Sequence, residues 1–156
     1  MDLLTNIIRN KLVLLVAISW FAAQLVKTAL YCVVNKQFRA ERLFGAGGMP
    51  SAHSASVTSL VVGTAILYGV SGYEFAFSVV FAAVVIYEAR GVRREAGDHA
   101  KLLNRIIDVF ESDDFFSMGV KERLNEFIGH TGMQILMGCI LSIGICFSAY
   151  AFGFFS

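Results

Sequence analysis

The sequence predicts an all-α fold, an integral membrane helical bundle with four transmembrane spans plus interfacial amphipathic helices. The composition is the first reason, because 56% of the 156 residues are hydrophobic, only 16% are charged, and the mean hydropathy is +0.66. Soluble domains carry about a quarter charged residues. The second reason is that the apolar residues gather in four long runs, with one proline in the whole chain. These features disfavour a soluble enzyme, a disordered chain and a nucleic-acid binder.

The first predicted span covers 12–34. A helix of this length is about 35 Å long, enough to cross a hydrocarbon core of about 30 Å. A cleaved signal peptide is the alternative, since Arg9 and Lys11 precede the run. The run is too long for that, and Gln24 and Lys27 interrupt what would be a clean apolar core.

The remaining runs predict spans at about 54–70, 72–90 and 133–155. Small residues at regular spacing let helices approach closely in lipid. They stand at Ala55, Ser59 and Gly63 in the second span and at Gly138, Ser142 and Gly144 in the fourth. We expect the chain, 1–156, to form a single membrane domain.

The interfacial loop between the third and fourth spans, 91–132, has apolar residues at three- and four-residue spacing between Leu102 and Phe110. This pattern predicts an amphipathic helix at the membrane surface. An acidic break at 111–114 ends that helix, and a second short amphipathic helix is expected at about 120–128.

Basic residues are shared unequally between the two ends of the predicted spans. Ten lysines and arginines lie in the loops 35–52 and 89–132, against two before the first span. The positive-inside rule places both loops in the cytoplasm. We expect the protein in a bacterial inner membrane.

The sequence gives little sign of a metal site. Cys32, Cys139 and Cys146 lie in apolar runs without metal-ligand spacing, as small buried residues do. They predict neither a disulfide framework nor a zinc site, and no cofactor is expected. An alternative hypothesis takes Glu88 and Asp98 as ligands of a divalent metal for lipid phosphate transfer.

A glycine-rich segment, 44–54, enters the second span through Pro50, Ser51 and His53. Proline and serine are typical of a helix start. The amides and positive dipole at such a start bind phosphate readily. On its own, the segment is more typical of an interfacial turn.

Other polar residues stand at the same membrane face. Lys27 lies about 10 Å inside the end of its span, where it marks a functional site or extends to the surface. Arg90, Arg93 and Arg94 close the third span, and His130 opens the fourth. Because these span ends share one face, the groups converge. Two histidines with several cations suit phosphoryl transfer.

Three segments carry a resemblance to a known family: 47–54, 91–97 and 129–134. They read Gly-Gly-Met-Pro-Ser-Ala-His-Ser, Gly-Val-Arg-Arg-Glu-Ala-Gly and Gly-His-Thr-Gly-Met-Gln. In this order, and over most of the chain, they resemble the divergent branch of the type 2 phosphatidic acid phosphatase superfamily, which is related to the vanadium haloperoxidases.

The resemblance implies a membrane-embedded lipid phosphatase without a metal. Its substrate would be a lipid phosphomonoester or diphosphate, such as phosphatidate or a polyprenyl pyrophosphate. His130 would attack phosphorus to form a phosphohistidine, His53 would protonate the leaving alkoxide, and Gln134 would orient His130. The implied phosphate-binding residues are Lys27, Arg39, Arg42, Ser51, Arg90, Arg93 and Arg94.

The sequence also departs from the superfamily pattern. Gln134 replaces the usual aspartate, and Val34 stands where the first arginine is expected. His99 follows Arg93 at the family spacing, but no span follows it, so His130 is the preferred nucleophile. Four spans instead of six suggest a core completed by a homodimer. The alternative function is a non-catalytic membrane protein that binds or translocates an anionic lipid.

Overall fold

The computed structural model describes residues 3–37, 48–111, 124 and 130–155. The described residues form helices and no strand, as the composition predicted. The helices are α1 (Leu3–Arg9), α2 (Lys11–Asn35), α3 (Ala52–Tyr68), α4 (Tyr73–Arg90), α5 (Val92–Glu111) and α6 (Gly132–Ala151).

One helix corresponds to each predicted span. The bounds of α2 and α4 differ from the prediction by one residue at most, whereas α3 lies two residues earlier and α6 ends four residues earlier. The early ends have a local cause, because Gly69 follows α3 at φ +79° and Gly153 lies just beyond α6 at φ +70°. Glycine adopts this left-handed conformation at no steric cost, so it is suited to terminate a helix.

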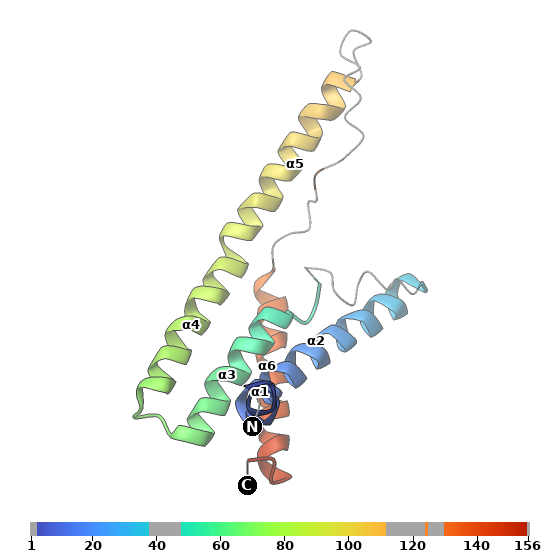
Figure 1. Ribbon diagram of the computed structural model, residues 1–156. Coiled ribbons are helices and arrows are strands. Elements are labelled where there is room, and N and C mark those ends of the chain that lie inside the picture. Colours follow the sequence, from blue (N-terminus) through green and yellow to red (C-terminus); the bar gives the residue numbers. More distant parts are fainter. Residues whose placement is uncertain (1–2, 38–47, 112–123, 125–129, 156) are drawn as a thin grey trace.

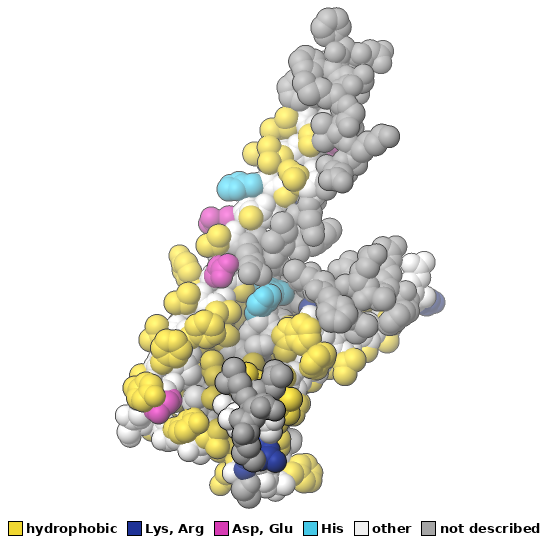
Figure 2. All heavy atoms as spheres, viewed as in Figure 1, with side chains coloured by type: hydrophobic (Ala, Val, Ile, Leu, Met, Phe, Trp, Pro, Cys, Tyr) yellow, Lys and Arg dark blue, Asp and Glu magenta, His cyan; other side chains and the backbone are white. Residues whose placement is uncertain are grey.

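Three stretches are long and apolar enough to cross a membrane: Lys11–Asn35, Tyr73–Val109 and Gly132–Ala151. The second runs through α4 into α5, but α4 alone is about 27 Å long and nearly matches a hydrocarbon core of about 30 Å. The fourth apolar helix, α3, has 17 residues. Hydrophobic side chains cover much of the described bundle surface (Figure 2), as expected of a surface in contact with lipid.

The central helix of the bundle is α3, which contacts α2, α4 and α6 (Figure 1). Its predicted small-residue face is buried: Ala55 and Ser59 are fully enclosed, and a Cβ added at Gly63 would lie 2.6 Å from Leu12 Cδ1 of α2. Gly63 therefore leaves space for the ends of the leucine side chains of α2.

Two of the predicted contact points on α6, Gly138 and Ser142, are buried. The prediction for Gly144 is wrong, because a Cβ added there would meet nothing within 4 Å. Its position six residues after Gly138 turns it to another face of the helix.

Beyond Gly91, α5 continues in nearly the direction of α4 and extends past the other helices (Figure 1). Its apolar side chains at Leu102, Ile106 and Val109 are exposed. Asn104 is buried and exchanges two hydrogen bonds of 3.0 Å with the backbone of Leu124. The helix predicted at 120–128 lies outside the described residues except for Leu124.

Candidate functional site

The site is at the end of the bundle where α2 and α4 finish and α3 and α6 begin (Figure 1). Four apolar runs in series require this arrangement, since each helix reverses the direction of the one before. The topology therefore brings together segments that are far apart in the sequence.

The start of α3 is built by Pro50 and Ser51. The Met49–Pro50 peptide bond is cis, and Ser51 has the extended backbone of an N-cap residue. The Ser51 side chain accepts a hydrogen bond of 3.3 Å from the backbone N–H of Ser54. This cap places His53 at the second position of α3, where the positive end of the helix dipole lies.

The start of α6 is built by Thr131 and Gln134. The Thr131 hydroxyl accepts from the Gln134 N–H at 3.4 Å, and Gln134 Oε1 accepts from the Thr131 N–H at 3.1 Å. This reciprocal pair is a capping box. It fixes the side chain of Gln134 beside His130, the residue immediately before the cap.

The His130 ring is oriented by Gln134, because its Nδ1 lies 3.1 Å from Gln134 Oε1. The capping box requires the amide oxygen to face Thr131, so the same oxygen faces His130 and accepts a hydrogen bond from Nδ1–H. The lone pair of the neutral ring then lies on Nε2. This tautomer suits a nucleophile that attacks through Nε2.

The two helix starts are joined by backbone contacts. The Ser51 N–H donates to the Gln134 carbonyl at 2.9 Å, and the Ser54 hydroxyl donates to the Ile135 carbonyl at 3.0 Å. Gly138 permits this approach, since a Cβ there would overlap the Ser54 hydroxyl and the Ser51 carbonyl. The relative position of the two histidines is therefore set by direct contact between α3 and α6.

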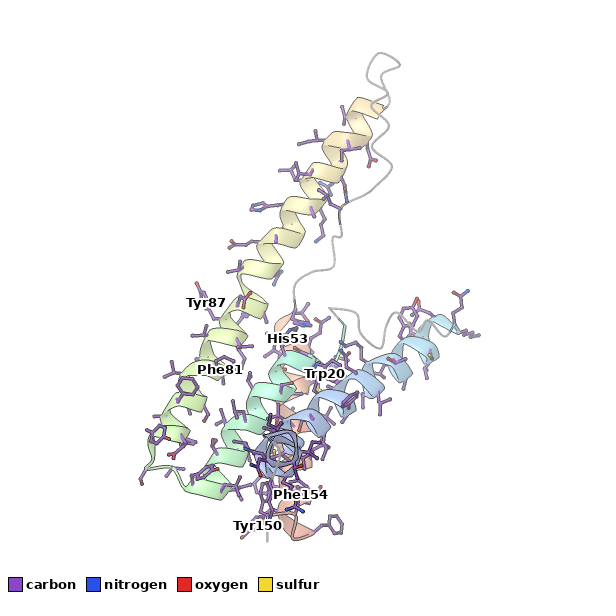
Figure 3. All side chains as sticks on the ribbon, in the orientation of Figure 1. Trp20, His53, Phe81, Tyr87, Tyr150 and Phe154 are labelled. Atoms are coloured by element: carbon purple, nitrogen blue, oxygen red, sulfur yellow. The ribbon has the colours of Figure 1, made fainter. Side chains whose placement is uncertain are left out.

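The central feature of the site is the pair of imidazoles. The ring centroids of His53 and His130 are 5.7 Å apart, with an angle of 59° between the ring planes. His130 is only 3% exposed, whereas His53 is partly exposed. Figure 3 shows His53 at the start of α3, beside the beginning of α6. The predicted convergence of the two histidines is present.

The first-turn amides of α3 and α6 contribute hydrogen-bond donors to this end of the bundle, and the helix dipoles contribute partial positive charge. Each helix start presents backbone N–H groups without intrahelical partners and a partial positive charge. Two such starts side by side form a favourable place for an anion such as phosphate.

Lys27 belongs to the same end of the bundle. Its side chain is 6% exposed, and Nζ donates to Gln24 Oε1 at 2.7 Å, so the ammonium is held within the structure and does not extend to the helix end. A Cβ added at Gly48 would lie 3.1 Å from Lys27 Cγ. Lys27 thus packs against the segment that leads to Pro50.

The arginines predicted to bind phosphate differ in their positions relative to the site. The His130 N–H donates to the carbonyl of Ala89 at 3.1 Å, which fixes the end of α4 and the neighbouring Arg90 close to the site. Arg90 is exposed, and so is Arg94 on α5. Arg93 also lies on α5, but its side chain is outside the described part of the structure. Arg39 and Arg42 lie outside the described residues.

The groups of the metal hypothesis are on the outer surface of α4 and α5. Asp98 is exposed, and its carboxylate pairs with the Lys101 ammonium at 2.8 Å, which holds the pKa of that carboxyl below its usual range. Within the described residues, no three His, Cys, Asp or Glu side chains are grouped as metal ligands. His99 is exposed on α5.

A family profile described as "Divergent PAP2 family" matches residues 8–146. The chain belongs to the divergent PAP2 family. It is also 35% identical over 129 residues to the uncharacterized membrane protein YuiD of Bacillus subtilis (strain 168), an alignment that covers 78% of this chain and 82% of that protein. No solved structure matches the chain.

In this divergent PAP2 protein, two of the three segments that carry the resemblance contain these helix starts, with His53 and His130, and the third lies at the start of α5. Both histidines, Gln134 and the contact point at Gly138 were predicted from the sequence, whereas the contributions of Ser54 and the Ala89 carbonyl to their geometry were not. The Thr-x-x-Gln spacing of the capping box was a usable signal. A backbone carbonyl such as that of Ala89 leaves no signal in the residue type.

Proposed function

We propose that this protein is a membrane-embedded lipid phosphatase that hydrolyses a lipid phosphomonoester or diphosphate through a phosphohistidine intermediate. The observation that carries the proposal is the 5.7 Å separation of the His53 and His130 rings at two adjoining helix starts. At this separation both rings can reach the same phosphate group, one at phosphorus and the other at a bridging oxygen. Membership of the divergent PAP2 family supports the same chemistry.

In the first step, His130 is the nucleophile. Its Nε2 lone pair attacks phosphorus, and the bond between phosphorus and the lipid oxygen breaks. His53 gives a proton to that oxygen, so the lipid leaves as an alcohol, or as a monophosphate if the substrate is a diphosphate. Gln134 keeps the attacking nitrogen unprotonated by accepting the hydrogen bond from Nδ1–H.

In the second step, water replaces the histidine. His53 takes a proton from the water, the water oxygen attacks phosphorus, and the bond between phosphorus and Nε2 breaks. Inorganic phosphate leaves, and both imidazoles return to their starting protonation. The net reaction consumes one water for each phosphate released.

The charges around the site would stabilise the transition state, in which negative charge spreads over the equatorial phosphate oxygens. The amides at the starts of α3 and α6 and the side chains of Lys27 and Arg90 are the described groups that can serve this purpose. The bacterial relative is a membrane protein, which supports a location in a bacterial inner membrane.

Phosphate release from phosphatidate and from a polyprenyl pyrophosphate in detergent micelles tests the proposal. We expect His130→Asn to lower the rate about 10³-fold or more, and His53→Asn to lower it about 10²- to 10⁴-fold. His99→Asn is the matched control, because His99 is an exposed histidine on α5. It should leave the rate unchanged.

The non-catalytic alternative makes a different prediction in the same assay. A protein that only binds or translocates an anionic lipid would take up lipid phosphate without releasing inorganic phosphate, and His130→Asn would have little effect. Phosphate release that survives in both histidine variants would exclude the phosphohistidine mechanism.

A further inference from the structure

A cavity of about 290 Å³ lies between the second half of α2 and the segment that leads into α3. Gly48 and Met49 line one side, and the α2 side is lined by Lys27, Leu30, Tyr31, Val34 and Asn35. The α2 residues follow the spacing of one helix face, over about 10 Å of helix. The volume is close to the lower limit of small-molecule sites, about 300 Å³.

The cavity adjoins the histidine pair. Ala23, one helical turn before Lys27, packs with Ala52 and Ala55 of α3 in the buried core, and Ala52 is the neighbour of His53. Gly48 stands five residues before His53 and contacts the Lys27 side chain. The end of the cavity that holds Lys27 is therefore the end nearer the site.

The lining is amphipathic in one direction along α2. Lys27 lies at the end nearer the site, with its ammonium held by Gln24 Oε1. The side chains of Leu30 and Val34 follow toward the end of the helix, where Asn35 completes the lining. A ligand that complements this order carries an anion at one end and a hydrocarbon chain at the other. A lipid phosphate has this form.

We propose that this cavity is the subsite for the first part of the hydrocarbon chain of the lipid phosphate, with Lys27 next to the phosphate. The assignment rests on the proposed function for the identity of the reacting group. It adds a prediction that the function alone does not make: affinity should depend on chain length through Leu30 and Val34.

The test measures binding without catalysis. Butylphosphonate and dodecylphosphonate carry a carbon–phosphorus bond that the proposed reaction cannot cleave, and each is titrated against thermal unfolding of the full chain in detergent. We expect dodecylphosphonate to stabilise the wild-type protein at lower concentration than butylphosphonate does. Leu30→Trp should fill the cavity and weaken dodecylphosphonate about tenfold, the equivalent of losing contacts to about two methylene groups.

The matched control is Leu25→Trp, since Leu25 is an exposed leucine of α2 outside the cavity lining. It should bind both phosphonates as the wild type does. Equal dodecylphosphonate affinity in the two variants would overturn the assignment. An absence of any chain-length effect in the wild type would overturn it as well.

A second pair of variants keeps the test decisive if Leu30→Trp does not fold. Val34 and Val33 are neighbours with 78% and 76% exposure, and only Val34 lines the cavity. Val34→Trp should weaken dodecylphosphonate and Val33→Trp should not; equal effects would overturn the proposal. If binding depends on the length of the hydrocarbon chain but no phosphate is released, the subsite holds and the phosphatase is rejected. If phosphate is released but binding does not depend on that length, the phosphatase holds and the subsite is rejected.

Discussion

Gln134 holds the ring of His130 through an oxygen that also accepts a hydrogen bond from the helix cap. Oε1 receives the Thr131 N–H and lies 3.1 Å from His130 Nδ1. A neutral amide oxygen can fix the tautomer as a carboxylate would, although it gives less support to a positively charged ring. The glutamine that departs from the superfamily pattern therefore remains suited to orient His130, the proposed nucleophile.

Replacing Gln134 with leucine should reduce catalysis more than it reduces stability. The His130 ring loses its acceptor, and we expect kcat for phosphate release to fall about 10- to 100-fold, the effect of a hydrogen bond to a charged group. Thr131→Ala is the control, because it removes the hydroxyl of the cap but keeps the Gln134–His130 contact. It should cost about 1 kcal/mol of stability and change kcat much less. Equal losses of kcat in the two variants would show that the cap alone matters.

Lys27→Met should lower activity without lowering the stability of the protein. A cation within a membrane span is costly, so its removal should leave the melting temperature in detergent unchanged or higher. The same change removes a charge of the proposed phosphate site, and we expect kcat/KM to fall about tenfold or more. Lys101→Met, on the surface of α5, serves as the control. Full activity in Lys27→Met would remove Lys27 from the site.

At the scale of the elements, the site depends on the contact between α3 and α6. The Ser51 N–H and the Ser54 hydroxyl donate to carbonyls of the first turn of α6, and Gly138 leaves the space that they need. His53 and Gln134 lie on the first turns of α3 and α6 that make these contacts. A change in helix separation would therefore alter the distance between the imidazoles.

Gly138→Ala should show this coupling. The added methyl group would overlap the Ser54 hydroxyl and the Ser51 carbonyl, so α3 and α6 must move apart at a cost of about 1–3 kcal/mol. We expect a lower melting temperature and a lower kcat. Gly144→Ala on the same helix is the control, since its methyl group would meet nothing within 4 Å. Equal melting temperatures and equal kcat values in the two variants would show that the close approach at Gly138 contributes to neither stability nor activity.

At the scale of the whole molecule, the hydrophobic pattern predicts most of the architecture. Four apolar runs separated by polar segments predict four helices, their order and the common end that holds both histidines. The distance between the rings could not be predicted in this way, because it depends on one glycine, a capping box and the carbonyl of Ala89. The spacing of small residues also predicted Gly144 as a contact point, because residue size alone does not tell which helix face is packed.

The topology predicts opposite chemical accessibility for the two ends of the bundle. Lys36 is exposed at the end of α2 near the site, and Ser71 is exposed in the turn between α3 and α4 at the other end. In a chain whose three native cysteines are replaced by alanine, a membrane-impermeant maleimide should label Ser71→Cys from outside the cell. Lys36→Cys should react only after the membrane is opened. The reverse pattern would place the site on the outer face, and equal labelling of both would contradict the topology.

Attack by His130 on phosphorus can be tested by rapid quenching of the reaction with a lipid phosphate labelled at phosphorus. We expect the wild-type protein and His99→Asn to carry a covalent phosphoryl group that is stable in base and released by acid, as a phosphohistidine is. His130→Asn should carry none. Label that persists in His130→Asn, or hydrolysis that proceeds in the wild type without any labelled protein, would contradict attack by His130.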